Sequence, residues 1–181
     1  LMNNLGRIRE IGNYELEELL GEGGMGEVWR GHHRMLARPV AVKLIRRARM
    51  GDGDSIAANR LLVRFQREAK ATAALRSPHT VAVYDFGLHE DTFYYVMELL
   101  DGMDLRTLVE VHGRQPVERV LHLLRQACHS LHEAHTVGLI HRDVKPGNLF
   151  VCRHGIDFDF LKVLDFGLVK DIRGSSHTIA A

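Results

Sequence analysis

The stretch HRDVKPGN at residues 141–148 and the triplet DFG at residues 165–167 form the densest group of chemically active side chains in this sequence. Asp143 and Asn148 lie on one polar loop, and Asp165 follows a short apolar stretch 17 residues after Asn148. Carboxylate and amide oxygens suit Mg²⁺, which keeps several waters and takes few protein ligands besides phosphate oxygens. Each residue alone is explained equally well by a polar turn that caps a short strand. The ordered set as a whole indicates a magnesium–phosphate site.

The same set suits the transfer of a phosphoryl group. A carboxylate that is separate from the metal ligands can accept a proton from a hydroxyl nucleophile. Lys145 can neutralise the charge on a phosphoryl group while it is transferred.

A glycine cluster, GEGGMGEV at residues 21–28, lies between two stretches of alternating polarity at residues 14–20 and 27–30. The alternation predicts two strands joined by a hairpin-like turn. Glycine backbone can approach a phosphate closely and turn its amide groups toward it. A flexible hairpin without a ligand explains the cluster equally well when it is taken alone. A dinucleotide-binding loop would need a helix to begin at the glycines, whereas Val28 and Trp29 continue as strand.

Two charged residues occupy positions where apolar side chains are expected. Lys43 lies in a third predicted strand, residues 39–45, on the same face as Ala41. The opposite face of that strand holds Val40, Val42 and Leu44. Glu68 shares the apolar stripe of a helix predicted for residues 57–76. Lys43 can extend to solvent or bind an anion, and Glu68 can lie at a solvated edge, but a pair between them would satisfy both charges.

The remaining periodicity predicts mostly strands first and helices afterwards. Alternating or short apolar runs predict strands at residues 81–86, 92–99, 149–152 and 161–164. Three- and four-residue spacing predicts helices at residues 105–111 and 117–134. Ser77 and Pro78 are expected to end the earlier helix, and Asp101-Gly102 is the expected hinge between the two parts. This order favours an α+β organisation.

The composition is that of a globular protein, with 45% hydrophobic and 26% charged residues among 181. A formal net charge of +1 predicts no general attraction to nucleic acid or membranes. No apolar run approaches the roughly 18 residues that span a bilayer, and no signal peptide is apparent. The two cysteines, Cys128 and Cys152, cannot form a disulfide framework. We therefore expect a cytoplasmic protein with no nucleic-acid partner and no membrane segment within this chain.

In order and spacing, these motifs resemble those of the catalytic domains of eukaryotic-like Ser/Thr protein kinases. They are the glycine loop, VAVK at residues 40–43, the helical Glu68, HRDVKPGN and DFG. The resemblance covers residues 14–170, and the wording of the motifs is most similar to the bacterial members. It implies a bilobal α+β fold. An N-lobe of antiparallel sheet with one helix is expected over residues 14–100, and a partial, mainly helical C-lobe over residues 101–181, after an N-terminal extension of residues 1–13.

The resemblance also implies roles for individual residues, with ATP and Mg²⁺ as the bound groups. Lys43 would bind the α- and β-phosphates and pair with Glu68. Asp143 would be the catalytic base, and Lys145 the cation beside the phosphoryl group. The implied Mg²⁺ ligands are Asn148 and Asp165.

The implied ATP contacts surround the whole nucleotide. Besides Lys43, they are Leu20, Gly21, Gly23, Gly26, Val28, Ala41, Met97, Glu98, Leu100, Asp104, Phe150 and Leu164. The glycines would cover the phosphates, Met97 would be the gatekeeper, and the backbone of Glu98 and Leu100 would meet the adenine edge. Asp104 matches a position that often contacts ribose, and the apolar members would form the two walls of the adenine slot.

Arg142 implies, by the same resemblance, activation by phosphorylation of the loop after DFG. A phosphate there would pair with Arg142 and with Lys170. The expected acceptors are Thr178, then Ser175 and Ser176. An unmodified polar loop is the alternative.

The chain ends at Ala181, before the substrate-binding segment that family members have, so we interpret it as a fragment of a kinase domain. We expect the helix at residues 117–134 to expose an apolar patch, and residues 1–181 alone to be poorly soluble. Many relatives have a larger aliphatic residue at the position of Thr72. How the helix predicted for residues 57–76 packs is therefore not settled by the resemblance. A region beyond Ala181 is a candidate for membrane attachment.

The leading hypothesis is a Ser/Thr protein kinase that transfers the γ-phosphoryl group of ATP to hydroxyls of protein substrates. All the polar residues expected for catalysis are present, and Lys145 accompanies Ser/Thr specificity in this family. An ATP-binding pseudokinase or scaffold without catalysis is the alternative, and this fragment by itself fits that description. A phosphotransferase for small molecules is a third hypothesis.

Overall fold

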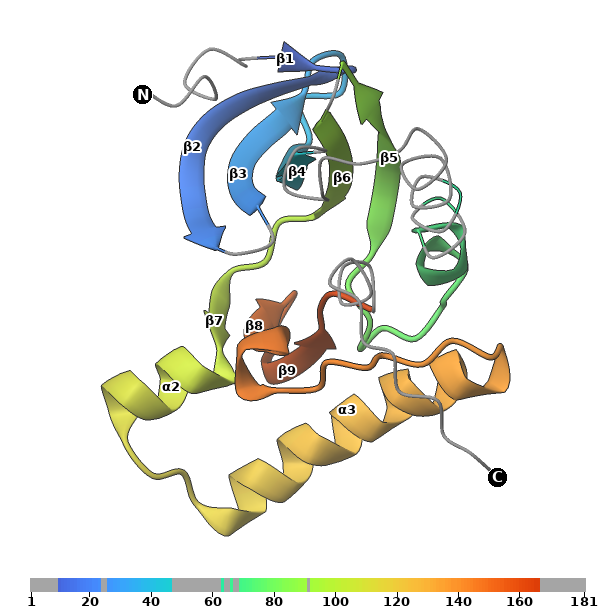
Figure 1. The fold of residues 1–181 in the computed structure, drawn as a ribbon. Helices are drawn as coiled ribbons and strands as arrows, with labels where there is room; N and C mark the ends of the chain where they lie inside the picture. Colours follow the sequence, from blue (N-terminus) through green and yellow to red (C-terminus); the bar gives the residue numbers. More distant parts are fainter. Residues whose placement is uncertain are drawn as a thin grey trace.

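The computed structural model describes residues 10–23, 26–46, 63, 66, 69–90 and 92–166. Two β-sheets lie one above the other, and a long helix runs beneath the lower sheet (Figure 1). The upper sheet is antiparallel, in the order β1-β2-β3-β4-β6-β5. Its strands are β1 (Glu10–Ile11), β2 (Tyr14–Gly23), β3 (Gly26–His33), β4 (Pro39–Arg46), β5 (Val83–His89) and β6 (Thr92–Glu98). The predicted N-lobe sheet is therefore confirmed, and β1 adds a short strand before residue 14.

The alternation in β4 places its side chains on two different hydrophobic clusters. Val40, Val42 and Leu44 pack with Ile11 and Val96 in one cluster. Ala41 and Ile45, on the other face, pack with Ala69, Phe93, Tyr95 and Met97. The predicted assignment of faces is confirmed, because residues two apart in a strand point the same way. The buried Lys43 shares the second face, toward the lower sheet.

The helix predicted for residues 57–76 is described only in part. Residues 63, 66 and 69–73 are helical, whereas Glu68 and most of the first half lie outside the described residues. The predicted end at residue 76 is wrong by three residues, since residue 74 is already a turn. The amide groups of Arg76 and Ser77 bond instead to the Glu133 carboxylate, each at 2.7 Å. Thr72 is fully buried.

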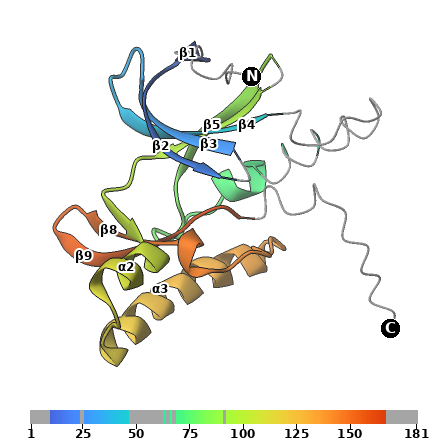
Figure 2. The ribbon, with the colours of Figure 1, turned by 60° about the vertical axis from the view of Figure 1, so that its left-hand side comes forward.

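The lower part contains the two predicted helices and a three-stranded sheet. The helices are α2 (Leu105–His112) and α3 (Val117–Thr136), and η3 (Pro146–Asn148) is a single 3₁₀ turn. The sheet has the order β7-β8-β9, with β7 (Gly102–Asp104), β8 (Leu149–His154) and β9 (Asp157–Val163). One face of β8 and β9 packs on α3 through Leu149, Val151, Leu161, Val163, Leu123 and Ala127. Figure 2 shows both helices beneath this sheet from the side.

The expected hinge at Asp101-Gly102 is wrong for Gly102, which begins β7 and pairs with Cys152. A Cβ atom at Gly102 would lie 2.0 Å from the Val151 carbonyl oxygen. The strand therefore approaches β8 too closely for any other residue. The connection between the two sheets lies just before it, after Glu98.

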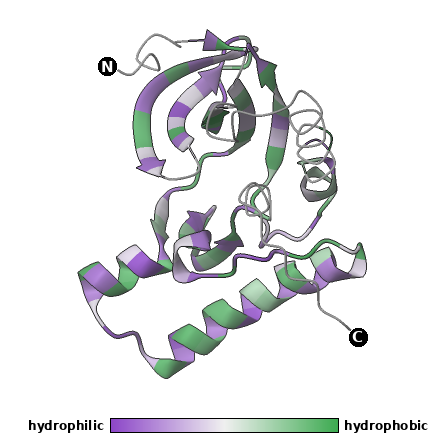
Figure 3. Ribbon diagram, viewed as in Figure 1, coloured by the Kyte–Doolittle hydropathy of each residue, from purple (hydrophilic) through white to green (hydrophobic). Residues whose placement is uncertain are grey.

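The outer face of α3 is apolar, as expected from the sequence. Val117 and Leu121 are 67% and 62% exposed, and Leu124 is 44% exposed. Figure 3 shows several hydrophobic stretches along α3, separated by hydrophilic ones. The expected poor solubility of residues 1–181 remains a prediction. Among the described residues, no helix has the length and apolar character that crossing a membrane requires.

Candidate active site

A partly buried ion pair links the upper sheet to the segment that follows β9. Lys43 Nζ, on β4, lies 2.7 Å from Asp165 Oδ2, in the segment after β9. The Lys43 side chain is only 7% exposed and the Asp165 side chain 25%. The expected partner of Lys43, Glu68, lies outside the described residues, so that pairing stays a prediction. Among the described residues, the structure places Lys43 against the carboxylate expected to bind Mg²⁺.

The polar loop after α3 brings the other predicted side chains together. Asp143 Oδ2 accepts a hydrogen bond from Lys145 Nζ at 2.9 Å and another from Asn148 Nδ2 at 3.3 Å. Asn148 Nδ2 also donates to the Asp143 carbonyl at 2.8 Å. The Asp143 side chain is 11% exposed. A cation and an amide therefore hold this carboxylate in one orientation.

His141 connects this loop to the segment that precedes Asp165. The Asp143 amide donates to His141 Nδ1 at 3.2 Å, so the ring proton lies on Nε2, which donates to the Leu164 carbonyl at 2.7 Å. The Leu164 amide in turn donates to the Asn148 carbonyl at 2.9 Å. The His141 ring lies 4.9 Å from that of Phe166, which is fully buried. These bonds hold the segment that contains Asp165 beside the loop that contains Asp143 and Asn148.

Two residues of this site have backbone angles that only glycine adopts easily. Arg142 has a φ of 61° and Asp165 a φ of 52°. Such angles cost roughly 1–3 kcal/mol for ordinary residues and persist where surrounding contacts fix them. The hydrogen bonds of His141 and the ion pair of Lys43 are contacts of this kind. Contacts with the rest of the protein thus fix the backbone at Arg142 and Asp165.

Strand β2 ends and β3 begins on the side of the upper sheet nearer the lower sheet (Figure 1), and the predicted phosphate-binding glycines lie at these ends. Gly21 pairs with Val28 and Gly23 with Gly26. Gly26 has a φ of 130°, and a Cβ atom there would lie 1.9 Å from the Leu44 carbonyl oxygen. At Gly21 and Gly23, by contrast, no atom of the described residues lies within 4 Å of such a position. Packing thus requires glycine at Gly26 but leaves open space at the other two.

We predict that Gly26→Ala lowers the free energy of unfolding by about 1–3 kcal/mol, because the new methyl group meets backbone in a strained conformation. Gly23→Ala is the matched control and should change stability far less. Urea unfolding of both variants tests this. Equal stability of the two variants would show that contact with Leu44 does not require glycine at this position.

Four of the apolar residues expected around adenine lie in one cluster. Ala41 and the buried Met97 pair across β4 and β6, and Val28 and Leu164 pack on the same cluster. Leu20 is 49% exposed at the end of the hairpin. Phe150 is part-buried in β8, Leu100 is also part-buried, and Glu98 ends β6. The expected slot residues therefore come from both sheets.

Asp104, expected to contact ribose, caps helix α2. Its Oδ1 accepts hydrogen bonds from the amides of Arg106 and Thr107 at 3.0 and 3.1 Å, and Oδ2 accepts from the Thr107 hydroxyl at 2.8 Å. Burial alone would raise the pKa of Asp104, but the bonds from Thr107 and the charge and amide of Arg106 lower it below its ordinary value. The carboxylate is thus ionised, and its oxygens accept hydrogen bonds from the first turn of α2.

Asp104→Ala should destabilise the fold by about 1 kcal/mol at pH 7, the typical cost of losing a helix cap. Because the folded pKa is lowered, this stabilisation is complete above the ordinary value of 3.8 and is lost as the pH falls through the folded value. Asp104→Asn keeps the cap but removes the titration, and is the control. Urea unfolding at pH 7 and pH 3 should show the wild-type advantage over Asp104→Ala shrinking at low pH. A constant difference would contradict this assignment.

The donor set fits a magnesium ion bound together with phosphate. Asn148 uses its amide nitrogen for Asp143, which leaves its amide oxygen as a ligand. Asp165 uses one oxygen for Lys43 and keeps the second. Two protein oxygens are enough for Mg²⁺ when phosphate oxygens and water complete its octahedral shell. No cluster of three His, Cys, Asp or Glu side chains is placed to hold a metal in the described part of the chain.

Two residues with a role in this region were not singled out from the sequence. His141 was part of a quoted motif, but its bridging bonds depend on the fold. Lys162, in β9, is 4% exposed and pairs with Glu98 at 2.6 Å. A signal for it was present, since Lys162 interrupts an apolar strand in the same way as Lys43.

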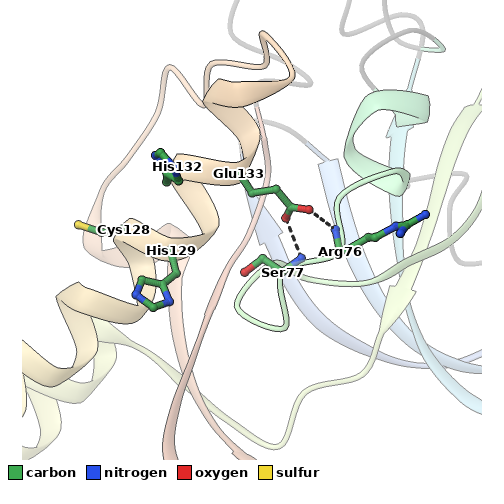
Figure 4. A pocket seen from close by; sticks show the side chains of 6 residues that line it. All are labelled: Arg76, Ser77, Cys128, His129, His132 and Glu133. Carbon is green, nitrogen blue, oxygen red and sulfur yellow. Dashed lines mark hydrogen bonds between the residues drawn. The ribbon is translucent and has the colours of Figure 1, made fainter.

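A surface pocket lies away from these residues, between α3 and the loop before β5. It is lined by Arg76, Ser77, Cys128, His129, His132 and Glu133. Figure 4 shows the Glu133 carboxylate spanning the gap to the amides of Arg76 and Ser77. None of the residues predicted for ATP or Mg²⁺ lines this pocket. We therefore assign the candidate site to the residues around the Lys43–Asp165 ion pair and the loop that contains Asp143.

Comparisons with known proteins agree with these motifs. A family model described as "Protein kinase domain" matches residues 14–180. Serine/threonine-protein kinase pkn3 of Myxococcus xanthus is 39% identical over 158 residues, which are 87% of this chain and 28% of the relative. PknB of Mycobacterium tuberculosis is 39% identical over 170 residues, 92% of this chain and 26% of the relative. This chain thus spans about a quarter of the length of these curated relatives.

Solved structures resemble the fold as well. The crystal structure of the M. tuberculosis PknI kinase domain matches with a TM-score of 0.73 and 29% sequence identity. The match covers 87% of this chain and 59% of that structure. The common architecture therefore extends over nearly all of the present chain.

Proposed function

This chain belongs to the protein kinase family, and on that premise we propose that the protein transfers the γ-phosphoryl group of ATP to serine and threonine hydroxyls of protein substrates. The observation that supports this most strongly is the ion pair between Lys43 and Asp165 across the two sheets. It brings the expected phosphate-binding cation and the expected magnesium ligand to one point. We further propose that the lobe boundary lies near residue 100, and that the protein acts in the cytoplasm, where ATP is supplied.

Asp143 is the proposed catalytic base. Its carboxylate is held by Lys145 and Asn148 and can accept the proton of a substrate hydroxyl as the hydroxyl oxygen attacks the γ-phosphorus. Lys145 is 51% exposed, so it can move from Asp143 toward the phosphoryl group and offset its charge. The protein supplies position and charge, and forms no covalent bond with the phosphoryl group.

Lys43 and the glycine hairpin are proposed to hold the triphosphate from above, with Asn148 and Asp165 below. Mg²⁺ between these two residues would neutralise charge on the β- and γ-phosphates. Lys43 is already buried beside Asp165, so it needs no large movement to reach a phosphate in the same space. The open space at Gly21 and Gly23 lets backbone amides approach the phosphates.

The adenine ring is proposed to lie between the apolar walls that Ala41, Val28 and Leu164 contribute. Met97 is buried behind this slot, and the backbone after it would meet the adenine edge. Asp104 would meet the ribose only with the oxygen lone pairs that its helix cap leaves available. Arg142 remains a proposed partner for a phosphorylated loop, whose candidate acceptors lie outside the described residues.

The experiment is incubation of the full-length protein with γ-labelled Mg-ATP and a dephosphorylated protein acceptor such as casein. We expect label on phosphoserine and phosphothreonine of the acceptor protein. This label should be absent when the acceptor is left out. A panel of small alcohols and sugars in place of casein tests transfer to small molecules. ATP binding without transfer to any protein would favour a pseudokinase, and absence of ATP binding would contradict the proposal.

A further inference from the structure

Lys162 forms a second buried ion pair between the two sheets. Its Nζ lies 2.6 Å from Glu98 Oε1, and the two side chains are 5% and 15% exposed. Lys162 belongs to β9 of the lower sheet, and Glu98 is the last residue of β6 in the upper sheet. Lys43 and Lys162 are the buried lysines of the described residues. The proposed chemistry gives Lys43 a role and leaves Lys162 without one.

The Glu98 carboxylate also bonds to the segment before β5, which is the other described segment that joins the two sheets. Its Oε1 accepts a hydrogen bond from the Ala82 amide at 2.7 Å, and the Glu98 amide donates to the Ala82 carbonyl at 3.0 Å. Ala82 directly precedes β5. The two described segments that join the sheets, before β5 and after β6, are thus bonded to each other next to Lys162.

The segment before Ala82 is fixed to the lower part. The Val81 amide donates to the Val163 carbonyl at 3.1 Å, and the Val163 amide donates to the His79 carbonyl at 2.8 Å. The hydroxyls of Thr80 and Ser130 are 2.7 Å apart and buried. Hydrogen bonds therefore fix the chain to the lower part up to Val81, and Lys162 lies beside the point where the chain then enters the upper sheet.

Lys162 also lies beside the proposed adenine slot. It pairs with Phe150 across β8 and β9, so both side chains leave the same face of the lower sheet. Their neighbours Leu149, Val151, Leu161 and Val163 leave the opposite face and pack in the lower core. Phe150 and Leu164 are the lower wall proposed for adenine, and Glu98 begins the backbone proposed to meet its edge.

We propose that Lys162 is a positioning residue for the nucleotide: through Glu98, it fixes the backbone after β6 relative to the lower wall of the adenine slot. This inference rests on the proposed function, since it assumes that the slot binds adenine. A buried ion pair contributes little net stability relative to apolar residues, but it sets geometry when both partners are fixed. Glu98 is fixed by Ala82, and Lys162 by its strand.

The test uses the full-length protein and compares adenosine and Mg-ATP binding with steady-state kinetics. Lys162→Met alone leaves a buried carboxylate unpaired, so Glu98→Gln/Lys162→Met, which removes both charges, is the deciding variant. We expect adenosine and Mg-ATP to lose affinity by the same factor, roughly 3- to 10-fold, the size of one positioning contact. The KM for ATP should rise by that factor while kcat stays within about twofold. Lys162→Arg, which keeps the pair, should restore both affinities.

The control is Arg119→Met, which removes an ion pair that lies within the lower part and is more exposed. Arg119 on α3 bonds Asp159 of β9 at 2.6 and 2.9 Å, and its hydrogen-bond partners among the described residues, Asp159 and Gln115, both lie in the lower part. Its adenosine affinity should stay at the wild-type value. An unchanged adenosine affinity in the folded double variant would overturn the inference, as would a fall in kcat with KM constant or an equal loss in Arg119→Met. A wild-type protein that binds neither adenosine nor ATP would instead refute the proposed function.

Discussion

Asp143→Asn should lower kcat by roughly 10²–10⁴-fold, the usual contribution of a positioned general base. The asparagine side chain keeps the size of the carboxylate and can still bond Lys145 and Asn148, so the loop should keep its shape. It cannot accept the proton of a substrate hydroxyl. ATP affinity should remain near the wild-type value, because Asp143 is not a proposed nucleotide contact. Steady-state kinetics with a protein acceptor and direct ATP titration measure the two effects separately.

Asp157→Asn is the matched control for this variant. Asp157 is exposed at the start of β9, and the same change of charge there should leave kcat unchanged. Undiminished transfer in Asp143→Asn would remove Asp143 as the base. A loss of ATP binding equal to the loss of kcat would assign it to binding instead of chemistry.

Lys43→Met should lower kcat/KM for ATP by roughly 10²–10³-fold, as expected for the loss of a charged group beside the transferring phosphates. Methionine keeps the apolar stem that packs beside Tyr95 and removes the ammonium group. Asp165 then loses its 2.7 Å partner and gains freedom to move. Since a cation bound to the triphosphate is lost, ATP affinity should fall more than adenosine affinity, which separates this variant from those at Lys162.

Lys70→Met is the control, because Lys70 is exposed on the same helical segment as Thr72. Its kinetics should match those of the wild type. Melting temperatures of both variants must be measured, since removing one member of a buried pair can destabilise the fold. A folded Lys43→Met protein with wild-type ATP affinity would show that this lysine binds no phosphate.

Strand β4 was predictable because its residues alternate between two buried clusters. In β4 the alternation was complete enough to assign Val42 and Lys43 to opposite sides. Strand β7 was not predicted, since its three residues, Gly102–Asp104, contain no periodic signal and depend on pairing with β8. The earlier helix ends sooner than Ser77-Pro78 suggested, because Glu133, more than fifty residues away in sequence, bonds the chain there.

The residues of the site were predictable as motifs, but their contacts were not. From the sequence, Lys43 could extend to solvent or pair with an anion, and Glu68 was the expected partner. The described contact is with Asp165, whose position depends on β9 and on the bonds of His141. Lys162 presented the same anomaly as Lys43, an amine within an apolar strand. Its partner, Glu98, becomes adjacent only when the two sheets are stacked.

The central claim is that Lys43, Asn148 and Asp165 surround one magnesium triphosphate beneath the glycine hairpin. A crystal structure with a non-hydrolysable ATP analogue and Mn²⁺ tests it most directly, because the anomalous signal of manganese locates the metal. The account predicts manganese bound to the Asn148 amide oxygen and the Asp165 carboxylate, with Lys43 on the α- or β-phosphate. Metal and phosphates located away from these three side chains would contradict it.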